Sequence, residues 1–283
     1  MNGLLTPIPI RIAAQYDDGE DARHFFFEPV RPGAVPSVSP GQFFLLTVPG
    51  AGEAAFTYAS LPDGQGRFAA LIRKTGNLTR ALFEKKTGAV LGMRGPYGKG
   101  WPVEAVSGHR VLVVAGGCGL APLAPVLEAL SEKPSQKLVL LYGARSHVSQ
   151  VLSQERKRWK EKFPILDVFD RPAPGAVRVG FPTEFLEEAT HRLGGPPEAV
   201  LTCGPESMMA AIARACSAHG LPAERIWLSV ERRMHCGVGL CGHCYIASTY
   251  ACREGPTYRW DEFERLTRRS QCRVVESPVG IHC

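Results

Sequence analysis

The stretch HRVLVVAGGCGLAP, residues 109–122, places an apolar run directly before a glycine-rich turn. The run is typical of a buried strand, and Pro122 and Pro125 stand near the start of the helix expected to follow. The pattern then repeats, because KLVLLYGAR, PILDVF, EAVLTCGP and RIWLSV have strand character and helical segments separate them. Strands spaced by helices predict a doubly wound parallel sheet over residues 104–230.

Two glycine turns in this region are candidate ligand sites. Gly116-Gly117-Cys118-Gly119-Leu120-Ala121-Pro122 follows the first strand, and its glycines permit close approach to a pyrophosphate at a helix N-terminus. Cys203-Gly204-Pro205 ends a later strand, at the edge where open α/β sheets bind ligands. Taken alone, each motif is also explained by an ordinary tight turn.

Residues 1–103 have a β-rich pattern. HFFFEPV, GQFFLLTV and GRFAALIR are short apolar runs separated by turn residues, which predicts a small antiparallel barrel. One helix is expected at about 77–86. Its start, Gly76-Asn77-Leu78-Thr79, can present N–H groups and a hydroxyl to a phosphate, although plain helix capping is the alternative. Upstream, Phe56-Thr57-Tyr58-Ala59-Ser60 supplies aromatic residues that can line a flavin ring.

Residues 231–283 are rich in Cys, Gly and Arg. A segment this small needs a crosslink to stay folded, and a metal centre can supply it. Cys236, Cys241, Cys244 and Cys252 have the spacing C-x4-C-x2-C-x7-C, the arrangement of plant-type [2Fe–2S] sites. A zinc knot from the same four thiolates is the alternative, but zinc sites favour paired C-x2-C hooks, so we favour iron–sulfur. We expect His235 and His243 beside the ligands and not among them.

The cysteine count and the N-terminus bear on the compartment. Nine cysteines, four of them clustered, in a chain without an export signal favour metal over disulfides. MNGLLTPIPIRI lacks a basic region and is broken by proline, so a cytoplasmic protein is expected. Residues 111–127 carry no charge, but glycines and prolines interrupt them, so no transmembrane segment is predicted.

Composition excludes several classes of protein. A chain of 283 residues with 45% hydrophobic and 21% charged residues is neither disordered nor fibrous, and its length suits two domains of ordinary size. Nine Arg and five acids in 225–275 contribute +4 of the net charge of +6. No nucleic-acid motif accompanies them, so nucleic acid is not expected as a partner. A docking face for a protein partner is the better interpretation, with a solvated surface as the alternative.

The order of these parts resembles a known family. F-T-x-x-S, G-x-x-T, G-P-Y-G, G-G-x-G-x-A-P and C-G-P follow one another as in the ferredoxin–NADP reductase superfamily, over about residues 5–230. ERRMHCGVGLCGHCYIASTYACREGP, residues 231–256, resembles the FAD- and NAD(P)-binding γ subunits of cytoplasmic [NiFe] hydrogenases. It is also similar to the corresponding subunit of anaerobic sulfite reductase and to the electron-transfer subunit of dihydroorotate dehydrogenase. The seven-residue gap before Cys252 is more like the first two.

The resemblance implies roles for individual residues. The flavin side comprises Phe56, Thr57, Tyr58 and Ser60, and Gly76, Leu78 and Thr79 hold the FAD pyrophosphate. The nicotinamide nucleotide site comprises Gly116, Gly117, Gly119, Ala121, Pro122, Cys203, Gly204 and Pro205. Ala54 stands where the family usually has an arginine for the pyrophosphate, so either FAD is held more weakly or Arg73 or Arg80 supplies that charge.

These observations predict an electron-transfer flavoprotein subunit with an FAD barrel at 1–103, an NAD(P) domain at 104–230 and a [2Fe–2S] lobe with a tail at 231–283. It would pass electrons between NAD(P)H and the iron–sulfur and catalytic subunits of a partner enzyme, with no catalytic acid–base residues of its own. A nucleotide-sensing module stapled by zinc is the alternative from another class. Arg145 and the run 156–158 are candidates for an NADP 2′-phosphate contact, with plain surface charge as the alternative.

Overall fold

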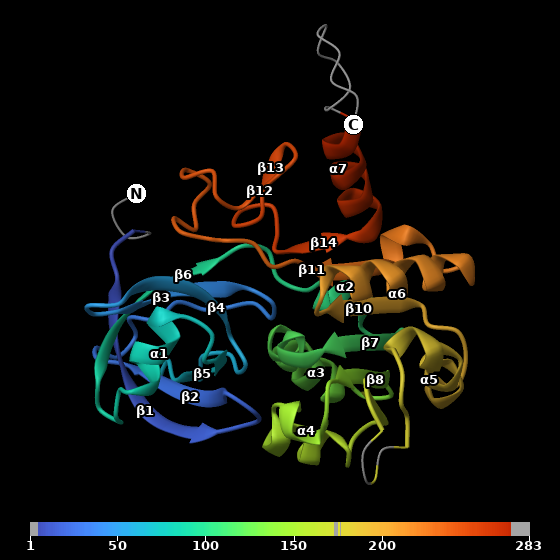
Figure 1. Cartoon of the computed structure of the whole chain (residues 1–283), viewed down its shortest axis with the longest axis horizontal. Coiled ribbons are helices and arrows are strands. Elements are labelled where there is room, and N and C mark those ends of the chain that lie inside the picture. Colours follow the sequence, from blue (N-terminus) through green and yellow to red (C-terminus); the bar gives the residue numbers. More distant parts are fainter. Residues whose placement is uncertain (1–4, 173–174, 176, 273–283) are drawn as a thin grey trace, which may run out of the picture.

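The computed structural model describes residues 5–172, 175 and 177–272. Two six-stranded sheets lie side by side, and the C-terminal segment crosses above both of them (Figure 1). This architecture confirms the expected antiparallel first half, α/β second half and small C-terminal lobe.

The first sheet is antiparallel, with strand order β4-β3-β6-β1-β2-β5. Its strands are β1 (Ile8–Asp17), β2 (Ala22–Pro29), β3 (Phe43–Val48), β4 (Gly52–Thr57), β5 (Phe68–Arg73) and β6 (Val90–Tyr97). The sheet curls closed because Ala59, just after β4, donates its N–H to Ala69 in β5 at 2.8 Å. Aromatic side chains fill the interior, where Phe27, Phe44 and Phe68 are almost fully buried.

One short helix, α1 (Asn77–Phe83), connects β5 to β6. It ends three residues before the expected end at about 86. Leu82 is its last buried side chain, and Lys85 and Lys86 offer no apolar face to extend the packing. Gly88, with φ +89°, then turns the chain into β6.

The second sheet has the order β14-β11-β10-β7-β8-β9. Its parallel strands are β7 (Arg110–Gly116), β8 (Lys137–Ala144), β9 (Ile165–Phe169), β10 (Ala199–Cys203) and β11 (Ile226–Ser229). The connecting helices are α2 (Val103–Val106), η1 (Gly117–Leu123), α3 (Ala124–Ser131), η2 (His147–Ser149), α4 (Ser153–Trp159), η3 (Pro182–Phe185), α5 (Leu186–Leu193), α6 (Glu206–Ala218) and η4 (Ala223–Arg225). The glycine turn therefore enters a 3₁₀ helix, η1, which contains Pro122, before α3 begins.

The C-terminal segment adds a strand that the sequence pattern did not reveal. β14 (Thr257–Arg259) pairs antiparallel with β11 at the edge of the second sheet, so the sheet is mostly but not wholly parallel. The hairpin β12 (Tyr245–Ile246) and β13 (Thr249–Tyr250) precedes it, and α7 (Trp260–Cys272) follows it. Of the two tail cysteines, Cys272 ends α7 without a described side chain, and Cys283 lies outside the described residues.

An apolar cluster joins the two halves. Ala59, Leu71 and Trp101 of the barrel half pack with Leu120 and Ala121 of the α/β half. The indole Nε1 of Trp101 donates to the Pro122 carbonyl at 2.8 Å, so its polar end is also satisfied. This contact fixes the barrel half against the end of η1.

None of the helices in the described ranges combines the length and the apolar composition that a membrane crossing requires.

Candidate functional site

The two predicted nucleotide motifs lie together at the carboxyl edge of the second sheet. β7 and β10 are neighbours, and Ala115 pairs with Cys203 in their register. A Cβ atom on Gly119 would lie 2.4 Å from the Cys203 carbonyl oxygen. A Cβ atom on Gly116 would lie 2.9 Å from the Pro205 ring. The two turns thus form one surface in which backbone packs on backbone, as close approach of a dinucleotide requires.

The cysteines in these turns are protonated thiols. Burial raises the pKa of Cys203 to about 12, and its Sγ lies 3.6 Å from the Ser229 carbonyl oxygen. Burial also raises the pKa of Cys118, although the nearby Arg73 opposes this effect. Neither residue has the lowered pKa of a reactive thiolate, so the geometry supports a packing role for both.

The residues of the flavin-side motif differ in how deeply they are buried. Tyr58 is 1% exposed and packs against Phe44 and Phe68, with ring centroids 4.8 and 5.2 Å away. Phe56 and Thr57, at the end of β4, are only half-buried. Within the described residues, Phe56 and Thr57 are therefore better placed than Tyr58 to contact a flavin.

The start of α1 forms a tight loop around Thr79. Its hydroxyl accepts hydrogen bonds from the N–H groups of Thr75 and Gly76, both at 2.9 Å, and donates to the Gly76 carbonyl. Thr79 thus shapes the loop from inside. Open space surrounds the Gly76 Cα, so a phosphate can approach its backbone.

Arg73 is a partly buried cation with an unused donor. It ends β5, faces the η1 loop near Cys118, and its buried Nε has no hydrogen-bond partner within the described residues. Arg80, the other candidate, is exposed and donates to the Asn77 side chain at 3.0 Å. A buried guanidinium nitrogen without a partner in the described residues fits an anionic ligand such as the FAD pyrophosphate that the sequence predicts here.

The cysteine loop directs backbone donors at sulfur. The N–H groups of Val238 and Leu240 point at Cys236 Sγ, at 3.4 and 3.3 Å, and the Gly239 N–H points at Cys252 Sγ at 3.2 Å. Such bonds stabilise thiolates that ligate iron.

The four thiols differ in exposure. Cys241 is exposed, Cys236 is half-buried, and Cys244 and Cys252 are buried. A single tetrahedral zinc would hold four sulfurs about 3.8 Å apart. In the described part of the chain, however, Asp18, His24 and Glu155 are the only metal-ligating side chains found with three ligand atoms all within 4.8 Å of one another. Among the described residues, no three of these sulfurs therefore lie as close together as one zinc ion would hold them.

Comparisons with known protein families match all three parts. Residues 9–101 match the oxidoreductase FAD-binding domain and residues 113–214 the oxidoreductase NAD-binding domain. Residues 231–264 match the iron–sulfur cluster binding domain of dihydroorotate dehydrogenase B. Sulfhydrogenase 1 subunit gamma of Pyrococcus furiosus is 33% identical over 232 residues, which cover 78% of this chain and 79% of that protein.

The chain belongs to the ferredoxin–NADP reductase-like family of FAD- and NAD-binding oxidoreductases.

Other relatives place it among electron-transfer subunits. A probable dihydroorotate dehydrogenase B electron-transfer subunit of Methanopyrus kandleri is 33% identical, covering 91% of this chain and 92% of that protein. A solved chain of an NADH-dependent reduced ferredoxin–NADP oxidoreductase shares the fold, with a TM-score of 0.70, 24% identity, and coverage of 94% and 98% of the two chains. The chain is an electron-transfer flavoprotein subunit with FAD, NAD and iron–sulfur domains, and its relatives are subunits of multi-subunit enzymes.

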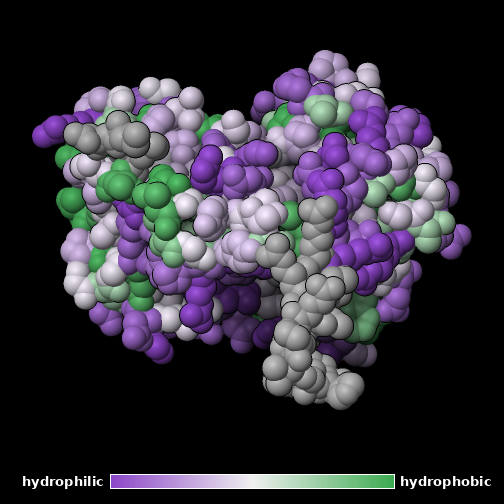
Figure 2. Space-filling model, turned by 90° about the horizontal axis from the view of Figure 1, so that it is seen from above, coloured by the Kyte–Doolittle hydropathy of each residue, from purple (hydrophilic) through white to green (hydrophobic). Residues whose placement is uncertain are grey.

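Ala54, which stands where the family usually has an arginine, lines a cleft of about 510 Å³ together with Ala55. The other wall of this cleft includes Arg232 and Arg233. Figure 2 views the molecule from above, the side that carries the C-terminal lobe, and hydrophilic side chains predominate where the two halves meet.

Sequence reasoning missed Arg94, which precedes the Gly95-Pro96-Tyr97-Gly98 motif. Its guanidinium donates to the backbone carbonyls of His235 and Cys236, at 2.9 and 3.1 Å, and also forms an ion pair with Glu53. The hint that the sequence offered was that Arg94 directly precedes the Gly95-Pro96-Tyr97-Gly98 motif. The partners lie 141 and 142 residues away, and no local pattern reveals them.

A second buried polar group joins the two halves. Asp18 accepts hydrogen bonds from the N–H groups of Leu152 and Ser153, at 2.8 and 3.1 Å, and from the Ser153 hydroxyl at 2.7 Å. His24 and Glu155 lie beside it. Because N–H and O–H donors already occupy the Asp18 carboxylate, this group serves as a connection between barrel and sheet.

The candidates for an NADP 2′-phosphate contact differ in their burial and in their ion pairs. Arg156 is mostly buried, donates to the Val151 carbonyl and stacks over Tyr142, and Arg158 pairs with Glu128. Arg145 is exposed directly after β8. Within the described residues, Arg145 and the exposed Lys157 are therefore the cations of this set without an ion pair, and Arg145 stands at the carboxyl end of β8.

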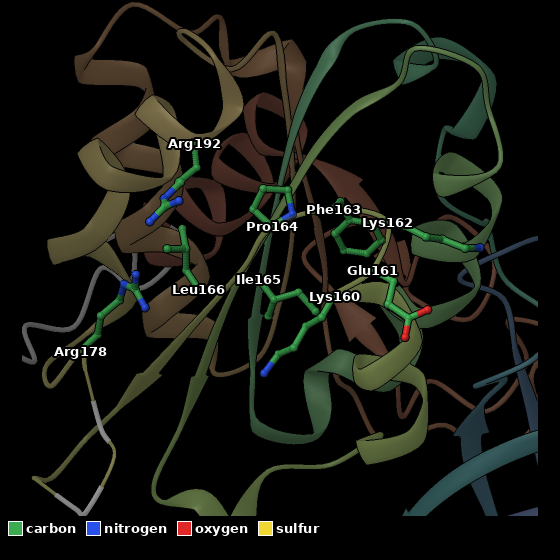
Figure 3. Close-up of a pocket in the computed structure, with 9 residues that line it drawn as sticks. All are labelled: Lys160, Glu161, Lys162, Phe163, Pro164, Ile165, Leu166, Arg178 and Arg192. Carbon is green, nitrogen blue, oxygen red and sulfur yellow. The ribbon is translucent and has the colours of Figure 1, made fainter.

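A cationic cleft of about 520 Å³ lies elsewhere, at the edge strand β9 (Figure 3). Lys160 pairs with Asp167 at 3.1 Å, and Arg178 pairs with Glu188, so most of its charge is neutralised. Residues 160–164 precede β9 and so lie at the amino end of the strand. Ligands of open α/β sheets bind at the carboxyl ends, so this cleft is not the nucleotide site.

Proposed function

We propose that this chain carries electrons between NAD(P)H and the catalytic subunits of a cytoplasmic [NiFe] hydrogenase, through FAD and a [2Fe–2S] cluster held by Cys236, Cys241, Cys244 and Cys252. The observation that carries the proposal is a four-cysteine loop that directs three backbone N–H groups at the sulfurs of Cys236 and Cys252 and that Arg94 attaches to the flavin barrel. It supports a redox relay over a zinc-stapled nucleotide sensor. The seven-residue gap before Cys252 favours the hydrogenase and sulfite reductase types over the dihydroorotate dehydrogenase type.

When bound, FAD would supply hydride chemistry with a nicotinamide, and a [2Fe–2S] cluster would supply one-electron transfer. The chain's own residues bind and orient these groups. The glycine turns after β7 and β10 hold the nucleotide against backbone, and Arg73 neutralises phosphate charge at the barrel. Cys203, buried beside the nicotinamide turn, excludes water and remains protonated.

The edge of the cluster loop faces solvent, which supports transfer to a partner. Cys241 is exposed, and Leu240 and Tyr245 nearby are 76% and 53% exposed. Exposed apolar residues beside a redox centre suit docking of another protein chain. The arginines of 231–268 favour an acidic counterpart.

A second candidate partner is the catalytic subunit of dihydroorotate dehydrogenase. The match of residues 231–264 to the iron–sulfur domain of that enzyme, and the relative from Methanopyrus kandleri, favour it.

One experiment tests both candidates. The full chain, carrying an affinity tag, is purified from its native cells together with its bound subunits. The complex is assayed for NAD(P)-coupled hydrogen oxidation, sulfite reduction and dihydroorotate oxidation. We expect hydrogen oxidation by the complex, and only dye reduction by NAD(P)H from the chain alone. A chain that lacks flavin and iron–sulfur absorption, or one that is catalytically complete alone, would contradict the proposal.

A further inference from the structure

All five N–H donors of Arg94 have acceptors. Nε and Nη2 bond to Glu53. Nη1 bonds to Tyr97 Oη at 3.3 Å and to the Cys236 carbonyl at 3.1 Å, and Nη2 also bonds to the His235 carbonyl at 2.9 Å. Arg94 is only 8% exposed, so these bonds form away from bulk water. A planar guanidinium can hold so many acceptors in one fixed arrangement.

The anchor on the barrel side is equally well held. Glu53 in β4 accepts a further hydrogen bond from the Thr47 hydroxyl at 2.7 Å. Burial alone would raise the pKa of Glu53, but the bonds from Arg94 and Thr47 hold it below its ordinary value. Glu53 is therefore ionised at neutral pH, and the pair consists of one full positive and one full negative charge.

Tyr97 adds a second contact between barrel and cysteine loop. A Cβ atom on Gly237 would lie 2.6 Å from the Tyr97 ring, and Gly237 has φ +77°. Tyr97 and Arg94 thus hold the backbone of residues 235–237 from two sides, at the point where the loop presents its first thiol.

We propose that Arg94 is a positioning residue for electron transfer, which fixes the first cluster ligand against the flavin barrel and, with Glu53, sets the charge beside the cluster. The inference rests on the proposed function, because it takes Cys236 as a ligand. Electron transfer depends steeply on distance, and Arg94 ties Cys236 to β6, which is separated by one strand from the flavin motif at the end of β4: β6 pairs with β3, and β3 with β4.

The charge effect has a definite sign. Reduction adds one negative charge to a cluster, so a nearby guanidinium stabilises the reduced form and a nearby carboxylate destabilises it. Removing the charge of Arg94 should lower the reduction potential. Removing the charge of Glu53 should raise it.

The test compares Arg94→Met and Glu53→Gln with the unchanged chain. Each protein is titrated potentiometrically while the visible and electron paramagnetic resonance signals of the cluster are followed, and iron and FAD per chain are measured. We expect opposite shifts, each changing the electron equilibrium of the cluster about tenfold, or about 59 mV for one electron. Arg110→Met is the matched control, because Arg110 also lies on a strand, pairs with Glu198 and donates to a carbonyl, that of Pro196. It should leave the potential unchanged.

Each remaining outcome either supports or overturns the proposed role of Arg94. Unchanged potentials, or shifts in the same direction for both variants, would overturn the charge role. If Arg94→Met loses iron but keeps FAD, and Arg94→Lys retains more iron, the positioning role is supported. Loss of FAD and iron together would assign Arg94 to barrel stability instead. If the unchanged chain holds no cluster, the proposed function itself fails, and this result is visible before any variant is compared.

Discussion

Gly119 of the η1 loop lies directly against Cys203 of the neighbouring turn. A Cβ atom on Gly119 would stand 2.4 Å from the Cys203 carbonyl oxygen and 2.7 Å from the Gly204 nitrogen. Gly119 is not among the residues with positive φ, so space alone demands the glycine here. The contact joins the ends of β7 and β10 into one surface.

Replacing Gly119 with alanine should therefore push the two turns apart. We expect Gly119→Ala to lose about 1–3 kcal/mol of unfolding free energy, as other overpacked sites do, and to weaken NAD(P)H binding. Denaturant unfolding and the KM for NAD(P)H in dye reduction measure the two effects. Gly64→Ala is the control, because no atom lies within 4 Å of its Cβ position. Equal behaviour of the two variants would argue against the shared surface.

The cysteine series tests the cluster ligands. Serine in place of Cys236, Cys241, Cys244 or Cys252 should remove most of the iron, because serine is a poor ligand for these clusters. Cys216→Ser should keep it, since Cys216 lies in α6 and its burial raises its pKa to about 11. Iron per chain and the visible spectrum are the measurements. Full iron in Cys241→Ser would refute the assignment.

Arg73 and Arg80 can be separated by their effect on FAD. Arg73→Met should weaken FAD binding about tenfold, or about 1.4 kcal/mol, because it removes a buried donor that has no other partner among the described residues. Arg80→Met should leave the affinity unchanged, since Arg80 is exposed and bonded to Asn77. Fluorescence titration of the flavin-free protein measures both. The reverse ranking would assign the phosphate to Arg80.

Asp18 predicts an acid-sensitive connection between the two halves. Burial alone would raise the pKa of Asp18, but the His24 ring and the donors of Leu152 and Ser153 hold it below its ordinary value. A lowered folded pKa means that the stabilisation is present above the unfolded value of about 3.9 and is lost as the pH falls through the folded pKa.

We therefore expect Asp18→Asn to lower the unfolding free energy at pH 7 by about 1.5–3 kcal/mol, and the difference from the unchanged chain to disappear in strong acid. Asp63→Asn is the control, since Asp63 also accepts two backbone N–H bonds but within its own exposed turn. Denaturant unfolding at several pH values provides the measurement. A difference that persists below the folded pKa would show that charge is not the cause.

The parts of the site that follow from the sequence are those built from neighbours in the chain. The runs before Gly116 and Cys203 identify their strands, and the four-cysteine spacing lies within 17 residues. Contacts between distant segments gave no such signal. Leu152 reaches Asp18 across 134 residues, and β14 joins the sheet only because the chain returns over the linker between the two halves.

Tyr58 shows why a sequence motif alone does not identify the side chains that face a ligand. Its place in the F-T-x-x-S motif groups it with the predicted flavin residues, but its side chain is only 1% exposed and lies in the aromatic core of the barrel. Phe56 and Thr57, at the end of β4, are half-buried and remain accessible. A motif therefore identifies the segment, whereas packing decides which side chains face the ligand.

Arg253 is the arginine best placed to guide a partner to the cluster. Its side chain is 61% exposed, and its Cδ would lie 2.5 Å from a Cβ atom on Gly239, so it flanks the cysteine loop directly. Arg253 forms a long ion pair with Glu254, at 3.9 Å, whereas Arg259 is paired closely with Asp261 at 2.8 Å. We expect Arg253→Glu to slow electron transfer to the natural partner roughly tenfold at low salt, with the difference shrinking as salt screens the charges.

Two measurements make that prediction decisive. Reduction of a small one-electron dye by NAD(P)H should be unchanged in Arg253→Glu, because the dye needs no docking face. Arg31→Glu reverses an exposed charge in the barrel loop after β2 and should affect neither reaction. If Arg253→Glu slows dye reduction as much as partner reduction, the cluster itself is damaged. If salt leaves the difference unchanged, the arginine contributes packing in place of electrostatic guidance.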